Sequence, residues 1–204
     1  TAKEMLKTAD RLHSPEYIEV LENLGEVYRL AGKFDESLGS LEECDSLISK
    51  AEKVHRAQVL AKMGDTLFEK GDVERSSRVL EEALDALGAH IPRSKIGVFL
   101  ALFKEVSQQF LHFVFHGILV KKTYQGTHRQ MVIVLLLHRL AYSYYYSDNI
   151  KMFYLYLKGL NFLESKIGPC ADLAHNYTDG PAVYSTTLLA WPARAFRDGR
   201  LGLK

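Results

Sequence analysis

The sequence is poor in cysteine, the residue that builds disulfide scaffolds and thiolate metal sites. Its 204 residues contain only Cys44 and Cys170, which are not part of any paired spacing. A disulfide framework and a cysteine-rich zinc site are therefore excluded. Sparse, unpaired cysteines favour a reducing compartment, so we expect a cytoplasmic protein. We expect Cys44 to be buried as a small apolar side chain, whereas Cys170 follows Gly168-Pro169 at a helix start, where the helix dipole could make it reactive.

A surplus of charge of either sign is also missing. Lys and Arg number 26 and Asp and Glu number 25, which gives a formal net charge of +1. This balance creates no global field for phosphate groups, so we expect no nucleic-acid partner. Hydrophobic residues make up 47% of the chain and charged residues 25%, which argues for a packed core and against disorder.

The chain has no uninterrupted apolar run of the length that a transmembrane helix needs. The segment from Val98 to Val120 comes nearest, but Lys104, Glu105 and His112 interrupt it. A spanning helix requires about 20 apolar residues with few charges, so we expect no membrane partner. The rival interpretation is a peripheral membrane protein that uses this segment as an interfacial helix.

Sequence motifs of catalysis are absent. The chain has no glycine-rich phosphate-binding loop and no Gly-x-Ser-x-Gly turn. The best metal candidates are His112 and His116, one helical turn apart, but Phe113 stands where zinc peptidases of the His-Glu-x-x-His type need their glutamate. We therefore expect no enzyme activity, no cofactor and no metal site. A metal-dependent helical enzyme using His112 and His116 is the rival interpretation.

A regular self-similarity runs through the first half of the chain. Leu24-Gly25 returns as Met63-Gly64, and the same interval separates Gly32 from Gly71 and Leu41 from Leu80. In each copy, one apolar-periodic run precedes a glycine-containing break and a second run follows it. This pattern predicts two copies of a helix, a short turn and a helix.

These residues resemble the tetratricopeptide repeat, in which pairs of helices stack into an array. The matching positions are Leu21, Leu24, Gly25, Tyr28, Ser37, Leu41 and Cys44 in the first copy, Leu60, Met63, Gly64, Leu67, Ser76, Leu80 and Ala83 in the second, and Leu137, Leu140, Ala141, Tyr144, Asp148, Leu157 and Leu160 in a third. The family's repeat is about 34 residues long. The interval from Gly25 to Gly64 is slightly longer, which implies a few extra residues between copies.

The resemblance and the helical periodicity together imply an all-α fold, a tetratricopeptide-like α-solenoid of antiparallel helix pairs with one long apolar helical insertion. We expect a single helical-repeat domain over residues 1–204 that is part of a longer protein. Its segments are repeat 1 at about 15–50, repeat 2 at 54–88, the insertion at 94–122, repeat 3 at 129–167 and a degenerate repeat 4 at 171–204.

The insertion is a run of apolar residues at helical spacing. These residues are Phe99, Leu102, Phe103, Val106, Phe110, Phe113, Val114 and Leu119. The spacing predicts one long buried helix or two stacked ones, with histidines on its polar edge.

A broader resemblance covers nearly the whole chain. It is carried by Leu84-Asp85-Ala86-Leu87-Gly88, Ile91-Pro92, Leu160-Asn161-Phe162-Leu163-Glu164, Gly168-Pro169 and Trp191-Pro192. In this order they are similar to the helical region that follows the AAA-type or STAND-type ATPase module in signalling proteins with adenylyl cyclase, kinase or transcription-regulator modules. The resemblance implies a regulatory scaffold that binds other proteins, without chemistry of its own.

The two halves of the chain carry opposite charge. Residues 1–88 hold 12 Lys and Arg against 19 Asp and Glu, a net charge of −7, whereas residues 89–204 hold 14 against 6, a net charge of +8. Exposed helix faces can differ in this way by chance. The alternative is that each half meets an oppositely charged neighbour.

A stacked array would line its concave face with the first helix of each pair. The outward residues predicted there are Glu19, Glu22, Glu26, Arg29, Gln58, Ala61, Asp65, Phe68, His138, Tyr142 and Tyr145. Chaperone-binding members of the repeat family hold a carboxylate with Lys and Asn where this chain has Glu22 and Glu26. We therefore expect a basic or aromatic-anchored protein or peptide partner, or another domain of the same chain.

Two further features allow a plain structural interpretation. Tyr142, Tyr144, Tyr145 and Tyr146 form a dense aromatic cluster, which we expect to be buried unless it anchors a peptide. The sequon Asn176-Tyr177-Thr178 is expected to occur by chance, since a reducing compartment does not glycosylate it.

Overall fold

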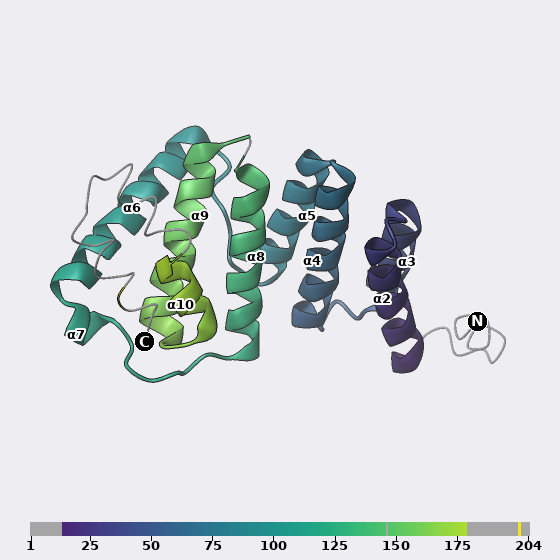
Figure 1. Ribbon diagram of the computed structural model, residues 1–204, viewed down its shortest axis with the longest axis horizontal. Coiled ribbons are helices and arrows are strands. Elements are labelled where there is room, and N and C mark those ends of the chain that lie inside the picture. Colours follow the sequence, from purple (N-terminus) through teal and green to yellow (C-terminus); the bar gives the residue numbers. More distant parts are fainter. Residues whose placement is uncertain (1–13, 146, 179–199, 201–204) are drawn as a thin grey trace. The chain divides into compact units, whose positions relative to one another are not determined.

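A computed structural model describes residues 14–145, 147–178 and 200 (Figure 1). The described residues form helices joined by short connections and include no strand, which confirms the all-α class. The helices are α2 (Pro15–Leu30), α3 (Phe34–Leu47), α4 (Lys53–Lys70), α5 (Val73–Ala86), α6 (Lys95–Val114), α7 (His116–Leu119), α8 (His128–Tyr144), α9 (Asn149–Phe162), the π-helix η1 (Leu163–Ile167) and α10 (Ala171–Thr178).

The chain divides into two compact units, one of residues 1–90 and one of residues 91–204. Their boundary falls at Ile91-Pro92, the break that precedes the predicted insertion. We call them unit 1 and unit 2 and describe each by itself. Of the fourth predicted repeat, α10 and residue 200 are described, and the remainder, including Trp191-Pro192, lies outside the described residues.

Unit 1 contains two helix pairs, each with a positive-φ glycine between its two helices. Ser14 caps α2 by accepting a hydrogen bond from the Tyr17 amide, and Pro15 opens the helix, where a missing amide is tolerated. Gly32 follows α2 and Gly71 ends α4, both with positive φ (73° and 91°), a conformation that glycine adopts without strain. Helix α3 contacts both α2 and α4.

The same close contact between a glycine and a leucine occurs within each helix pair. A Cβ atom on Gly25 would lie 2.7 Å from Leu41 Cγ, and a Cβ atom on Gly64 would lie 2.7 Å from Leu80 Cδ2. Each glycine therefore lets its helix approach a leucine of the next helix, at equivalent positions of the two copies. Cys44 is buried in the same core, beside Tyr17 and Leu21, as predicted.

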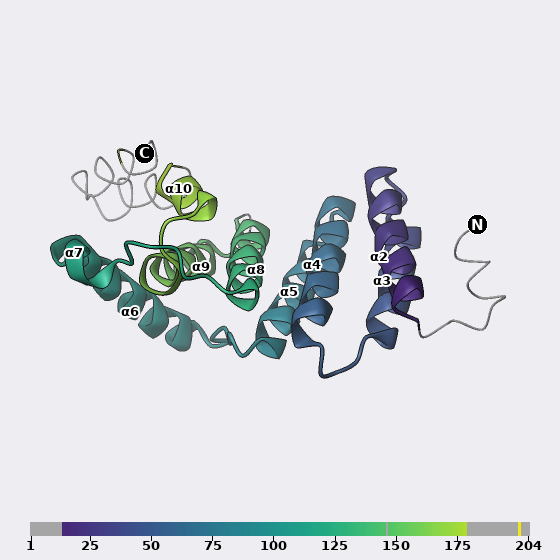
Figure 2. The ribbon, with the colours of Figure 1, turned by 90° about the horizontal axis from the view of Figure 1, so that it is seen from below.

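Unit 2 places α9 between α6 and α8, as Figures 1 and 2 both show. Thr127 and Gln130 close the start of α8 with a reciprocal capping box. The core around α8, α9, η1 and α10 contains Val134, Leu160, Leu163, Ile167, Leu173 and Tyr177.

The connection between α7 and α8 lies against η1. The Lys121 amide donates to the Glu164 carbonyl (2.8 Å), and the Gln125 amide donates to the Ile167 carbonyl (2.7 Å). Gly168 follows η1 with φ of 89°, and a Cβ atom there would lie only 2.4 Å from the Thr123 carbonyl oxygen. Only glycine allows the chain to pass this close.

The prediction that α6 is an ordinary buried helix is wrong. Its buried residues are Val98 and three polar ones, Glu105, Gln109 and His112, whereas large apolar side chains such as Phe103 are exposed. The helix is turned polar side inward because its polar residues find buried partners on α9 and η1. Within the described part of the chain, no helix has the length and apolar character to cross a membrane.

Candidate interaction surface

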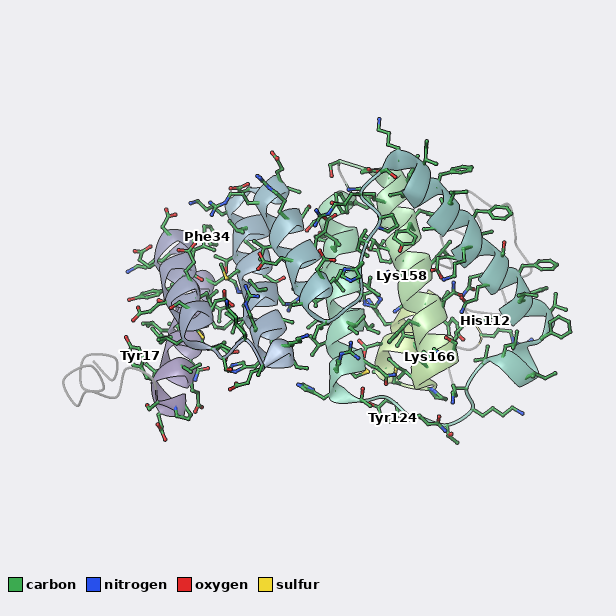
Figure 3. All side chains as sticks on the ribbon, turned by 180° about the vertical axis from the view of Figure 1, so that it is seen from behind. Tyr17, Phe34, His112, Tyr124, Lys158 and Lys166 are labelled. Carbon is green, nitrogen blue, oxygen red and sulfur yellow. The ribbon has the colours of Figure 1, made fainter. Side chains whose placement is uncertain are left out.

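An apolar row runs along the outer side of α6. It consists of Ile96, Phe99, Leu100, Phe103, Phe110, Leu111 and Val114, which we call the α6 stripe; Ile96 is 76% exposed and Phe103 68%. Ile118 and Leu119 on α7 are exposed as well. Figure 3 shows aromatic rings standing out from α6 on the side away from α9. Isolated apolar residues are normal on a protein surface, whereas several exposed apolar residues on one helix make that helix a candidate contact site.

A buried polar network lies on the opposite side of α6. The Gln109 side-chain amide donates to Asn161 Oδ1 (2.5 Å) and Glu164 Oε2 (3.0 Å), and His112 Nδ1 lies 2.6 Å from the same Glu164 oxygen. Asn161 Nδ2 donates to Glu105 Oε2 (2.6 Å), and the Tyr177 hydroxyl donates to Glu164 Oε1 (2.8 Å). These six residues, the polar network, join α6 to α9, η1 and α10.

Glu164 is the centre of this network and is completely buried. It belongs to η1, and the wider turn of a π-helix is a rare backbone form that often marks functional positions. Its two carboxyl oxygens lie within hydrogen-bond distance of the Gln109, His112 and Tyr177 side chains, so the buried group has directed partners. A buried carboxylate needs such partners, since leaving it unpaired costs several kcal/mol.

The network offers little to a metal ion or a substrate. His112 is 3% exposed; its Nδ1 faces Glu164, and its Nε2 lies 3.4 Å from Gln108 Nε2. A histidine–glutamate pair can hold or move a proton, but here both imidazole nitrogens already face protein groups. Among the residues that the structure describes, no group of three or more His, Cys, Asp or Glu is placed to hold a metal ion. The His116 side chain lies outside them.

The predicted concave-face residues of α2 are joined to α4 by ion pairs. Glu22 accepts from Lys62 Nζ (2.8 Å) and lies 3.0 Å from His55 Nε2. Burial alone would raise the pKa of Glu22, but the hydrogen bonds from Lys62 and His55 outweigh burial and lower it. Arg29 binds Glu26 (2.6 Å) and Glu69, and its pKa is raised, first by the hydrogen bond with Glu26.

The other predicted residues of unit 1 differ in exposure. Glu19 is exposed, whereas Gln58, Asp65 and Phe68 are half-buried. Ala61, which the periodicity placed outward, is 1% exposed, so that prediction is wrong. On α2 and α4, Glu19 is therefore an exposed acidic residue, whereas Glu22, Glu26 and Arg29 are engaged in ion pairs within unit 1.

The predicted residues of unit 2 lie on α8 and at its end. Tyr142 and Tyr145 are exposed, which favours the anchoring alternative over burial for these two tyrosines, and Tyr146 lies outside the described residues. His138 is half-buried with Nε2 about 3 Å from the Asn176 side-chain amide, and burial lowers its pKa. The Asn176 side chain is itself buried, so the sequon asparagine is not presented at the surface.

The sequence analysis did not predict the polar network, and it therefore did not predict that the apolar side of α6 faces outward. The available signal was the spacing of Glu105, Gln109 and His112, which are four and three residues apart and share one helix face. Three polar residues on one face of an apolar helix indicate either solvent or polar partners. Asn161 and Glu164 become the partners only through the fold.

Comparison of the chain with protein-family models, with curated proteins and with solved structures found no match. The features available for a functional conclusion are therefore the helical class, the repeated glycine–leucine contact, the α6 stripe and the polar network.

Proposed function

We propose that the chain is a non-catalytic interaction and regulatory segment of a larger intracellular signalling protein, built from tetratricopeptide-like antiparallel helix pairs. The observation that carries the proposal is the α6 stripe. Burial of apolar surface drives most protein association, and an exposed helix face of this kind is the feature that a contact would cover.

The repeated contacts support a stacked-pair organisation. Gly25 precedes Leu41 by the same interval as Gly64 precedes Leu80. The third predicted copy has Ala141 and Leu157 at this interval, both buried. In such arrays each layer leaves an apolar face that its neighbour covers. A helix with an uncovered apolar side is then a place where another layer or a partner packs.

Two further surfaces belong to this proposal. On unit 1, exposed Glu19 beside Glu22 and Glu26 would favour a basic ligand, and on unit 2 exposed Tyr142 and Tyr145 would provide aromatic anchors. Tyrosine offers a large contact area at a low cost in side-chain entropy. These residues remain the predicted binding positions of the two units.

Site-specific photocrosslinking in the intact protein, within its own cells, tests the interaction function. A benzophenone amino acid replaces Phe103, and in the matched control it replaces Leu135, an exposed apolar residue of α8 outside the stripe. We expect discrete protein crosslinks from position 103 that position 135 does not give. Absence of protein crosslinks at position 103, or crosslinks confined to residues 1–204 themselves, with the variant folded and expressed, would contradict the proposal.

A further inference from the structure

We propose that the α6 stripe binds an amphipathic helix of a partner protein whose edges carry acidic residues. The inference rests on the proposed interaction function and adds the chemistry of the partner. Three properties of α6 lead to it: the spacing of the outward residues, the sign of the charges beside them, and the fixed orientation of the helix.

The outward residues follow the spacing of a helix–helix seam. Five residues of the stripe and the exposed polar residue Ser107 share this spacing: Ile96, Leu100, Phe103, Ser107, Phe110 and Val114 are separated by four, three, four, three and four residues. This is the alternation of positions a and d in a heptad, which lets one helix lay its side chains into the holes of another. The 20 residues of α6 make a seam about 30 Å long, enough for a partner helix of about 20 residues.

The exposed charges of α6 are positive. Lys95 and Lys104 are exposed, and the only acidic residue from 95 to 114 is Glu105, which is buried in the polar network. A partner helix with acidic residues at its edges would therefore find complementary charge along the seam. Complementary charges steer association and fix the orientation of the pair.

The polar network fixes α6 with its apolar side outward. Turning the helix to hide the stripe would withdraw Glu105, Gln109 and His112 from Asn161 and Glu164. Uncompensated burial of Glu164 and exposure of apolar core would both oppose that rotation. The surface is thus formed before the partner arrives, so binding does not have to organise it.

A second copy of the chain fits the stripe less well. Lys104 lies near the middle of α6, so an antiparallel pair of stripes would bring the two Lys104 side chains close together. Lys95 adds positive charge at the start of α6, and like charges across a contact disfavour it.

A lipid surface would accept basic residues beside an apolar face, but it imposes no periodicity. The four-three alternation along the whole of α6 meets the requirement of a helical partner, whereas a bilayer needs only an apolar face. The observations therefore favour a helical protein partner, and a bilayer becomes one outcome of the test.

The test uses the full chain and a pair of synthetic peptides of about 20 residues, the length matched to α6. Both have Leu at positions a and d; one has Glu at the flanking e and g positions and the other has Lys. Like charges on each peptide keep it from pairing with itself. Fluorescence anisotropy measures the Kd of each peptide for the unmodified chain, for Phe103→Ser and for the matched control Leu135→Ser.

We expect the Glu peptide to bind the unmodified chain and Leu135→Ser with the same Kd, and to bind about tenfold or more tightly than the Lys peptide. Phe103→Ser should weaken the Glu peptide about tenfold or more, as expected for a central apolar anchor. Circular dichroism of each variant establishes that the helices remain folded.

Three results would overturn the proposal. Equal binding of both peptides, or none, would remove the acidic helix as the partner. Sedimentation with vesicles of phosphatidylcholine and phosphatidylserine that Phe103→Ser abolishes, without peptide binding, would assign the stripe to a lipid surface. A dimer that Phe103→Ser makes monomeric would assign it to a second copy. Protein crosslinks from position 103 without Glu-peptide binding would leave the interaction function standing and reject only this partner chemistry.

Discussion

Units 1 and 2 place their polar and apolar side chains in opposite ways. Unit 1 keeps Glu22, Arg29 and Arg56 in ion pairs near its surface and buries apolar residues such as Leu41. Unit 2 buries Glu164 and His112 at the contact between α6 and the helices beside it, and leaves Phe103 exposed.

The difference shows what a buried polar contact contributes to a helix pair. An apolar contact of the same size would often be as stable or more stable, since buried charge is expensive to desolvate. Directed hydrogen bonds instead select one rotation of α6 about its axis, because Gln109 and His112 meet Asn161 and Glu164 in only one orientation. In unit 2 the network thus determines which side of α6 faces outward.

The largest expected effect breaks that network. Glu164→Ala leaves Gln109, His112 and Tyr177 buried without their acceptor and should destabilise unit 2 by roughly 3–5 kcal/mol. The corresponding change in unit 1, Glu22→Ala, removes a half-buried ion pair and should cost about 1 kcal/mol or less. Hydrogen exchange with mass spectrometry measures the stability of each unit separately. Equal losses of stability in the two variants would contradict the difference between the two units.

A second prediction concerns the backbone at the end of η1. Gly168→Ala puts a Cβ atom against the Thr123 carbonyl at a positive φ, so we expect a loss of roughly 3 kcal/mol in the free energy of unfolding of unit 2. Gly39→Ala is the control, since nothing lies within 4 Å of its added Cβ in α3; it should raise stability by about 0.5–1 kcal/mol. A neutral Gly168→Ala in urea unfolding would show that the close approach is wrong.

A third prediction sharpens the internal equivalence of unit 1. Gly25→Ala and Gly64→Ala each force a leucine aside and should lower the free energy of unfolding by about 1–3 kcal/mol. The two losses should agree within about 0.5 kcal/mol. Adding Leu41→Ala to Gly25→Ala should recover part of the packing strain, which a double-mutant cycle in urea measures. Unequal costs would separate the two helix pairs that we treat as copies.

The smallest expected effect is on the pH dependence of stability. We expect the free energy of unfolding to fall at a higher pH in unit 2 than in unit 1. Burial lowers the pKa of His138. The nearby His175 lowers it further, whereas the hydrogen bond with Asn176 and the charge of Asp172 act in the opposite direction. Below the ordinary His pKa of 6.5, the folded state therefore binds fewer protons than the unfolded chain. The free energy of unfolding of unit 2 should therefore fall as the pH falls from 6.5.

In unit 1 the lowered pKa of Glu22 has the same sign but acts below its ordinary value of 4.5. Hydrogen exchange across the pH range should show the His138 contribution first and the Glu22 contribution later. His138→Gln should remove the first and Glu22→Gln the second. If His138→Gln leaves the pH dependence of unit 2 unchanged between 6.5 and 4.5, the assignment is wrong.

Much of unit 1 could be predicted from local rules. The equal spacing of Gly25 and Gly64 and of Leu41 and Leu80 predicted both helix pairs, and the structure places a close contact within each. Cys44 was correctly assigned to the core. These features depend on residues near in sequence, whose spacing the periodicity records directly.

Unit 2 was harder to predict because its decisive contacts join distant residues. His112 and Glu164 are 52 positions apart, and the helical spacing of the apolar residues assigned α6 to the core. The periodicity of α6 indicates a helix but does not determine which of its faces is buried. That choice depends on Asn161 and Glu164, whose positions are set by the fold.

The most direct test of the central claim is a charge exchange between α6 and its helical partner. The claim predicts that Lys104→Glu weakens the Glu-flanked peptide and strengthens the Lys-flanked one, each several-fold, or about 0.5–1 kcal/mol as expected for an exposed charge pair. Lys166→Glu, an exposed lysine of η1 outside the stripe, should change neither Kd. Identical responses of the two peptides to Lys104→Glu would contradict the account.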